Sequence, residues 1–409
     1  MINVLLPILL PSLANALPAP VPDAQPTLFT FTYAGNLVTA TWTGTGAATA
    51  PAACPTQTFT YNGAAITVPY TGPAAATPAA TTPAAGNVAP APSATTSTTP
   101  AVAAATTAAA SPAASSGVAK GFNYGSTGAN GAPLAESDFL ASFNAAKNLP
   151  GTSGFTSARL YTMIQAGTQN TPISAIPAAI ASKTTLLLGL WASAGQANID
   201  NEIAALKTAI SQYGTAFTDL ITGISVGSED LYRDSPTGIE NKSGVGAGPA
   251  EVASYIRQVK AAIVGTAAAG KLVGHVDAYP TWNNASVADV IAASDFIGLD
   301  AYPYFQFQMP NSIEQAADLF KTAYAATQSA AGGKPVWITE TGFPTSGATS
   351  GNAVPSTANA KTYWDQIGCG FAFDKINTYW YTLNDQGASP AFGVDNGGTP
   401  AFDLSCPAA

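Results

Sequence analysis

Two glutamates stand where apolar runs end, and their carboxyl groups are the side chains of this sequence best suited to acid–base or nucleophilic chemistry. Glu229 ends the run "ITGISVGSE" at residues 221–229, and Glu340 lies within "PVWITETGF" at residues 335–343. Acidic residues number only 23 in 409, so two at the ends of buried runs indicate a specific use. A protonated carboxyl can donate a proton to a leaving oxygen, while an ionised one can attack carbon or activate water.

Imidazole-based and metal-based catalysis have little support in the sequence. His275 is the single histidine, which excludes a Cys/His zinc cluster and a Ser-His-Asp triad around any other imidazole. Its place in the apolar run "KLVGHVDAY" favours a hydrogen-bonded structural role. No Gly-rich dinucleotide or phosphate-binding loop follows the first predicted strand. We therefore expect neither a cofactor nor a metal.

The overall charge restricts the partners. The chain carries 14 Lys plus Arg against 23 Asp plus Glu, which gives a net charge of −9 and a pI of about 4.5. It lacks the basic surface of a nucleic-acid-binding protein, and anionic membranes would repel it. A neutral polymer or a small neutral molecule is the expected partner, and we expect a monomer without a membrane span.

Composition divides the chain into four regions. Residues 1–16 predict a signal peptide, because a short apolar core precedes a small-x-small cleavage site. Residues 17–71 form a small β-rich region of unknown role with two predicted hairpins, the second turning at Asn62-Gly63. Residues 72–118 are a disordered Ala/Thr/Pro/Ser-rich linker that could carry O-linked sugars. Residues 119–409 combine aromatics, charges and periodic segments, as a folded domain does.

Two further features agree with a secreted protein. Asn241 and Asn284 each begin an Asn-x-Ser glycosylation triplet. Of the three cysteines, Cys369 and Cys406 could pair and hold the C-terminal tail, which leaves Cys54 free or paired elsewhere.

The last region alternates strand-like and helix-like segments. Clear helical periodicity covers residues 136–149, 198–213, 249–265, 312–328 and 357–368. Eight near-continuous apolar runs, typical of parallel strands buried on both faces, cover residues 120–126, 157–162, 184–192, 221–229, 271–279, 296–304, 335–343 and 376–384. This alternation predicts an α/β fold, the (β/α)8 TIM barrel, with a doubly wound open sheet as the alternative.

A barrel would bring the two glutamates together. They end the fourth and seventh strands, and the C-terminal ends of barrel strands form one mouth. Taken singly, Glu229 and Asp230 could favour the start of the next helix through its dipole, and Glu340 could pair with a buried arginine such as Arg159. Taken together, they favour glycoside hydrolysis, with retention at a carboxyl separation of about 5 Å and inversion at about 6.5–9.5 Å.

Three motifs carry a family resemblance over residues 119–409. "VGSEDLYR", "LDAYPYF" and "WITETGFPTSG" resemble the family-17 glycoside hydrolases, the β-1,3-glucanases of plants and fungi. The resemblance implies a retaining mechanism with Glu229 as acid/base and Glu340 as nucleophile. It also implies that Tyr302 lies near the nucleophile and that Tyr161 lies on the glycone side of the cleft.

Two positions depart from the pattern of that family. Phe343 stands where plant members usually have Trp. Ser228 stands where many members have an Asn whose amide binds the sugar 2-OH, and a serine has a shorter reach. Phe343, Ser228, and Trp380 on the eighth strand are further expected substrate-binding residues. Asp277 and Trp282, after the fifth strand, are weaker candidates for the same cleft.

These features predict a secreted glycoside hydrolase that acts on the β-1,3-glucan of the fungal cell wall by internal hydrolysis, transglycosylation or both. One alternative is an exo-acting β-glucosidase, which would need a closed pocket. Another is a non-catalytic glucan-binding protein of the wall, which the linker and the hairpin region support.

Overall fold

The computed structural model describes residues 117–385 and 387–407, together with the backbone of four strands between residues 27 and 69. The predicted signal peptide, the linker up to residue 116 and Cys54 lie outside the described residues. The chain forms two compact units that divide after Ala108.

The N-terminal unit contains a four-stranded antiparallel sheet in the order β1-β2-β3-β4. Strand β1 (Thr27–Tyr33) pairs with β2 (Asn36–Trp42), and β3 (Thr56–Tyr61) pairs with β4 (Ala64–Pro69). The last pairs are Tyr33 with Asn36 and Tyr61 with Ala64, so each pair of strands is antiparallel and adjacent in sequence. The two hairpins predicted from sequence are therefore confirmed at the level of the backbone.

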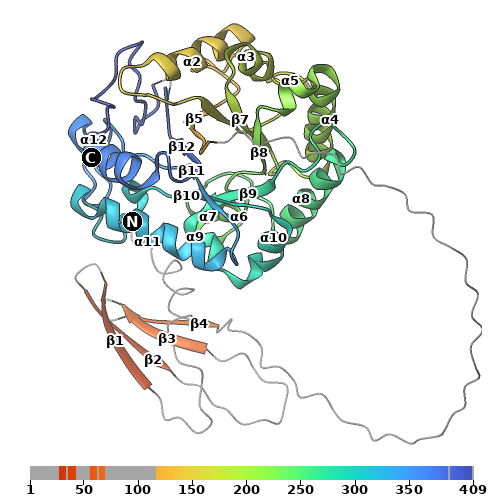
Figure 1. The fold of residues 1–409 in the computed structure, drawn as a ribbon. Coiled ribbons are helices and arrows are strands. Elements are labelled where there is room, and N and C mark those ends of the chain that lie inside the picture. Colours follow the sequence, from red (N-terminus) through yellow and green to blue (C-terminus); the bar gives the residue numbers. More distant parts are fainter. Residues whose placement is uncertain are drawn as a thin grey trace, which may run out of the picture. The chain divides into compact units, whose positions relative to one another are not determined.

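In the C-terminal unit, eight parallel strands of the described chain close into a barrel (Figure 1). They are β5 (Lys120–Tyr124), β6 (Ser157–Leu160), β7 (Thr185–Leu190), β8 (Ile221–Val226), β9 (Val273–Ala278), β10 (Ile297–Asp300), β11 (Val336–Glu340) and β12 (Thr378–Trp380). Each strand matches one predicted run. The pairing of β12 with β5 closes the ring, which confirms the (β/α)8 barrel and rules out the open sheet.

Helices surround the barrel (Figure 1). The five predicted ones are α2 (Glu136–Asn148), α4 (Gln196–Tyr213), α8 (Pro249–Ile263), α11 (Ile313–Ala330) and α12 (Thr357–Tyr363), which continues as a π-helix over Trp364–Ala372. The others are α3 (Ala175–Ser182), α5 (Thr215–Thr218), α6 (Asp230–Arg233), α7 (Pro236–Glu240), α9 (Tyr279–Trp282) and α10 (Ala288–Ala293). These helices have at most two turns, too short for a clear periodic signal. No helix of the described residues is long and apolar enough to cross a membrane.

The C-terminal tail is held against the barrel by a disulfide and a hydrogen bond. Cys369 and Cys406 are bonded across 37 positions of sequence, which confirms that predicted pair. Nearby, Trp364 Nε1 donates to the carbonyl of Leu404 at 3.0 Å. The tail therefore has a second attachment that does not depend on the disulfide.

Cys406→Ser is expected to lower the free energy of unfolding by about 2–4 kcal/mol, because the open loop gives the unfolded chain more freedom. Urea unfolding checks the value. The double variant Cys369→Ser/Cys406→Ser is the control and should lose no more than the single one. A stability equal to that of the wild type would show that the bond contributes nothing to folding.

Candidate active site

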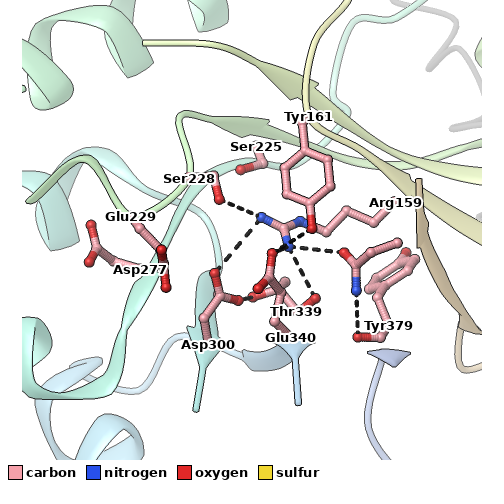
Figure 2. Close-up of polar contacts among 12 residues, drawn as sticks. Arg159, Tyr161, Ser225, Ser228, Glu229, Asp277, Asp300, Thr339, Glu340 and Tyr379 are labelled. Carbon is pink, nitrogen blue, oxygen red and sulfur yellow. Dashed lines mark hydrogen bonds and ion pairs between the residues drawn. The ribbon is translucent and has the colours of Figure 1, made fainter. Parts of the chain in front are cut away.

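The two predicted glutamates meet at the C-terminal end of the barrel. Glu340 is the last residue of β11, and Glu229 follows β8 in a turn that leads into α6. One carboxylate oxygen from each of Glu229, Asp300 and Glu340 lies within 4.8 Å of the other two. Figure 2 shows Asp300 and Glu340 at the guanidinium of Arg159, with Glu229 to one side of them.

Three donors hold the carboxylate of Glu340. Oε1 accepts from Nη1 of Arg159 and from the hydroxyl of Tyr161, each at 2.6 Å. Oε2 accepts from the hydroxyl of Tyr302 at 2.6 Å. Burial, followed by the charge of Glu340, raises the pKa of both tyrosines well above the ordinary value, so both phenols stay protonated donors. Charge-assisted bonds of this kind are short and strong, and they fix the orientation of the Glu340 carboxylate.

Arg159 connects Glu340 to the rest of the mouth. Its guanidinium donates to Oδ1 of Asn123 at 3.0 Å and to Oγ of Ser228 at 3.0 Å. The ion pair with Glu340 that the sequence suggested as a structural alternative therefore exists. It is compatible with catalysis, because it fixes the position of the Glu340 carboxylate at the barrel mouth.

Asp300 is a third carboxyl of the site that the sequence argument missed. It ends β10, accepts from Thr339 Oγ1 at 2.7 Å, and lies 3.9 Å from Nη2 of Arg159. Three carboxylates so close could hold a cation, but Arg159 already supplies positive charge to two of them. The strand-end position that singled out Glu229 and Glu340 would also have found Asp300.

Asp300→Asn is expected to keep kcat/KM within about threefold of the wild-type value, because Asp300 takes no part in the proposed reaction. Burial, followed by the charge of Glu340, raises the pKa of Asp300 well above its usual range, so a neutral amide resembles the protonated acid. Steady-state kinetics on a β-1,3-glucan oligosaccharide checks this. A loss as large as that of Glu340→Gln would place Asp300 among the reacting groups.

Glu229 has a different environment from Glu340. Its side chain is 27% exposed, and its Oε2 lies 3.6 Å from Nη2 of Arg233. Burial, followed by the negative charges of Glu340 and Asp277, raises the pKa of Glu229 to about 8. Glu229 is therefore held towards its protonated form, whereas three donors converge on the carboxylate of Glu340.

Ser228 and Asp230 flank Glu229 and are both buried. The Ser228 hydroxyl accepts from Arg159, and its amide donates to Oδ2 of Asp230 at 2.7 Å. Asp230 also accepts from the hydroxyl of Ser193. We expected Asp230 to act through a helix dipole, but α6 has only four residues and the carboxylate instead binds the turn. Arg233, in turn, donates to the carbonyl of Ser228.

The structure corrects the expectation that Phe343 and Trp380 contact substrate. Phe343 is 3% exposed and Trp380 is 2% exposed. The Trp380 ring packs against Trp364 at 4.9 Å between centroids and against Phe373 at 5.7 Å. Both side chains fill the space between barrel and helices, so neither offers a face to a sugar.

Tyr381 is the aromatic at the end of the eighth strand that the sequence argument missed. It follows Trp380, and its ring lies 5.8 Å from that of Tyr302. Burial, followed by the charge of Glu340, raises its pKa to about 12, so it belongs to the same mouth. Successive side chains of a strand point to opposite faces, which explains the error of one position.

Asp277 and Trp282, the weaker candidates after the fifth strand, are also buried. Trp282 donates from Nε1 to the carbonyl of Gly298 at 3.1 Å. Asp277 binds His275 and the backbone of α6. His275 is fully buried and hydrogen-bonded, which confirms its predicted structural role.

Comparisons with known proteins agree with this geometry. Residues 121–396 match the model of the BtgE/BtgC glycoside hydrolase domain. A protein of Aspergillus oryzae named "Probable glucan endo-1,3-beta-glucosidase" is 56% identical over 300 residues, which cover 72% of this chain but only 64% of that relative. The "Glucan 1,3-beta-glucosidase" of Saccharomyces cerevisiae is 29% identical over 273 residues, covering 66% of this chain and 82% of that protein.

A solved structure shares the fold. The glycoside hydrolase family 17 β-1,3-glucanosyltransferase from Rhizomucor miehei has a TM-score of 0.56 at 24% identity, covering 70% of this chain and 98% of that one. A TIM barrel with two facing carboxyls at its mouth defines a class of glycoside hydrolases. Within this class, the chain belongs to the BtgE/BtgC glycoside hydrolase family.

Proposed function

We propose that the protein is a retaining glycoside hydrolase that acts on β-1,3-glucan, with Glu340 as nucleophile and Glu229 as acid/base. The observation that carries this proposal is the pair itself. Glu340 is held by three donors, while Glu229 has a pKa of about 8, and their oxygens lie within 4.8 Å. Retaining enzymes separate their carboxyls by about 5–5.5 Å, whereas inverting enzymes leave room for water between them.

The first step forms a covalent intermediate. A carboxylate oxygen of Glu340 attacks the anomeric carbon as the bond from that carbon to the leaving oxygen breaks. The electron pair goes to the leaving oxygen, which takes the proton of Glu229. Arg159 and the two tyrosines on Glu340 hold the attacking oxygen in place.

The second step releases the sugar. Glu229, now ionised, takes a proton from water as the water oxygen attacks the anomeric carbon. The ester bond breaks, and its electron pair returns to Glu340. If a sugar hydroxyl replaces water, the same step makes a new glycosidic bond, which is transglycosylation.

The substrate class rests on chemistry and on the relatives. The acidic chain suits a neutral polymer, and Tyr161, Tyr302 and Tyr381 gather around Glu340 where a sugar ring could stack. The Aspergillus relative and the Rhizomucor enzyme are both named for β-1,3-glucan. Ser228 is buried and its hydroxyl binds Arg159, so we propose that it supports the site from below the sugar.

We also propose that the protein is secreted and acts at the cell wall. The predicted signal peptide and linker support this, and Asn241 and Asn284 of the two glycosylation triplets are both exposed. Exo-acting hydrolysis and non-catalytic glucan binding remain outcomes of the test below. The complete pair of carboxyls favours catalysis over binding alone.

Product analysis on a reduced β-1,3-glucan oligosaccharide tests the proposal. We expect shorter oligosaccharides whose first-formed reducing ends are β-anomers by proton NMR, because two inversions at carbon give retention. Products longer than the substrate would show transfer to a sugar. First-formed α-anomers would overturn the retaining mechanism, and glucan binding without any product would overturn the enzymatic function.

A further inference from the structure

Three consecutive residues of β9 clamp the turn that carries Glu229. His275 binds the turn before Glu229, the carbonyl of Val276 binds Glu229 itself, and Asp277 binds the helix that follows. The contacts are His275 Nδ1 to Val226 O at 2.6 Å, Glu229 N to Val276 O at 2.9 Å, Leu231 N to Asp277 Oδ2 at 2.9 Å and Tyr232 N to Asp277 Oδ1 at 3.2 Å.

The turn needs this support because its backbone adopts an unusual conformation at two residues. Glu229 has a φ of 56° and Gly227 a φ of 85°, both in the left-handed region. Residues other than glycine rarely adopt this backbone conformation. Where they do, contacts with the surrounding structure hold the backbone in place. A Cβ at Gly227 would lie 2.0 Å from Oδ2 of Asp230, so the turn has little room to rearrange.

The hydrogen bonds of His275 indicate its charge. A carbonyl only accepts, so Nδ1, which faces Val226 O, carries a proton. Nε2 lies 2.9 Å from Oδ2 of Asp277. Both oxygens of that carboxyl group already accept from other donors, so the group faces Nε2 as an acceptor; the donors are the amides of Leu231, Tyr232 and Ala278 and the hydroxyl of Thr281. Nε2 therefore carries the second proton.

The groups around His275 favour a positively charged imidazole. Asp277 of its own strand and Asp230 of α6 are the charged groups that act on it, the Trp282 ring of α9 packs 5.7 Å away, and its partner on β10 is the apolar Ile297. Burial opposes the charge, but the bond to Asp277 and the charges of Asp277 and Asp230 raise the pKa of His275 above its usual value.

We propose that His275 is a positioning residue for Glu229, and that it works as a buried imidazolium paired with Asp277. This inference rests on the proposed role of Glu229 as acid/base. The imidazolium joins the last carbonyl of β8 to the carboxylate that holds the first turn of α6. It thereby fixes both ends of the turn from which the Glu229 carboxyl reaches the leaving oxygen.

The charge is measured on the wild-type full chain by nitrogen and proton NMR of the imidazole, which is a single set of signals because the chain has one histidine. We expect two ring N–H groups at pH 7, where a free histidine with a pKa of about 6.5 is mostly neutral. A neutral ring with one N–H at pH 6 would overturn the charged pair. This measurement does not depend on whether the protein cleaves glucan.

The positioning role is tested with His275→Gln and two substrates. On a β-1,3-glucan oligosaccharide, kcat/KM should fall roughly 30-fold, because a misplaced acid cannot protonate the leaving oxygen. On a dinitrophenyl laminaribioside, whose leaving group needs no proton, kcat/KM should change by less than about threefold. An equal loss on both substrates, or no loss on either, would overturn the proposal.

Asp295→Asn is the matched control. Asp295 pairs with Lys260 at 2.6 Å and accepts from the amide of Val273, at the opposite end of β9 from Asp277. The variant should leave the ratio of the two kcat/KM values unchanged. If His275→Gln does not fold, Asp277→Asn takes its place and should show the same dependence on the leaving group. A wild type that cleaves neither substrate would instead overturn the proposed function, while the NMR result would stand.

Discussion

Glu340→Gln is expected to lower kcat on β-1,3-glucan oligosaccharides by about 10⁴-fold or more, since it removes the attacking oxygen of the first step. Gln is the informative substitution because its amide oxygen keeps an acceptor for Arg159, Tyr161 or Tyr302, which now converge on the carboxylate. Steady-state kinetics with reducing-end detection measures the loss. Circular dichroism shows whether the barrel remains folded.

Tyr302→Phe is the matched control for that experiment. It removes one donor to Glu340 but leaves the nucleophile, so a loss of roughly 10- to 100-fold is expected. Glu340→Gly adds a positive test, because azide can enter the vacated space and attack the activated dinitrophenyl substrate. The expected product is the α-glycosyl azide. Residual activity of Glu340→Gln above about one per cent of the wild-type value would exclude Glu340 as the nucleophile.

Glu229→Gln is expected to have an effect that depends on the leaving group. On a glucan oligosaccharide, kcat/KM should fall about 10²- to 10⁴-fold, because the leaving oxygen no longer receives a proton. On the dinitrophenyl substrate, kcat/KM should remain close to that of the wild type. Azide should raise kcat and yield the β-glycosyl azide, because it attacks the intermediate without help from a base. Equal losses on both substrates would contradict the acid/base assignment.

The pH dependence of the wild type follows from the same residue. Because its pKa is raised to about 8, Glu229 is protonated below that pH and loses its proton above it. Proton donation is therefore present at neutral pH, and kcat/KM on the oligosaccharide should fall tenfold for each pH unit above about 8. On the dinitrophenyl substrate, whose leaving group needs no proton, the wild type should lack this alkaline limb. A limb near pH 4.5 in the wild type would show that Glu229 is not shifted.

The local pattern of the sequence was sufficient for the barrel. Parallel strands that are buried on both faces have continuous apolar sequences. Each of the eight apolar runs contains a strand of the barrel. The same pattern located Glu229 and Glu340, because the C-terminal ends of all barrel strands lie at one mouth for any length or sequence of the loops. The Cys369–Cys406 pair was one pairing that the three cysteines allow, and the structure contains it.

Local pattern was not sufficient for the side chains around the glutamates. Strand β12 has only three residues, too few to show which of Trp380 and Tyr381 faces the mouth. Arg159 and Glu340 are 181 positions apart, and Asp277 and Leu231 are 46 apart, so these contacts exist only because the barrel closes. The periodicity of a sequence does not predict contacts between residues that are far apart along the chain.

The different environments of the two carboxyls depended on tertiary structure for an electrostatic reason. Glu229 and Glu340 are chemically identical, and sequence alone identified them as a pair. Their difference arises because three donors converge on Glu340, whereas Glu229 is half-buried beside the negative charges of Glu340 and Asp277. The energy of a charge depends on the distance to its neighbours and on its access to water, and both are properties of the folded chain.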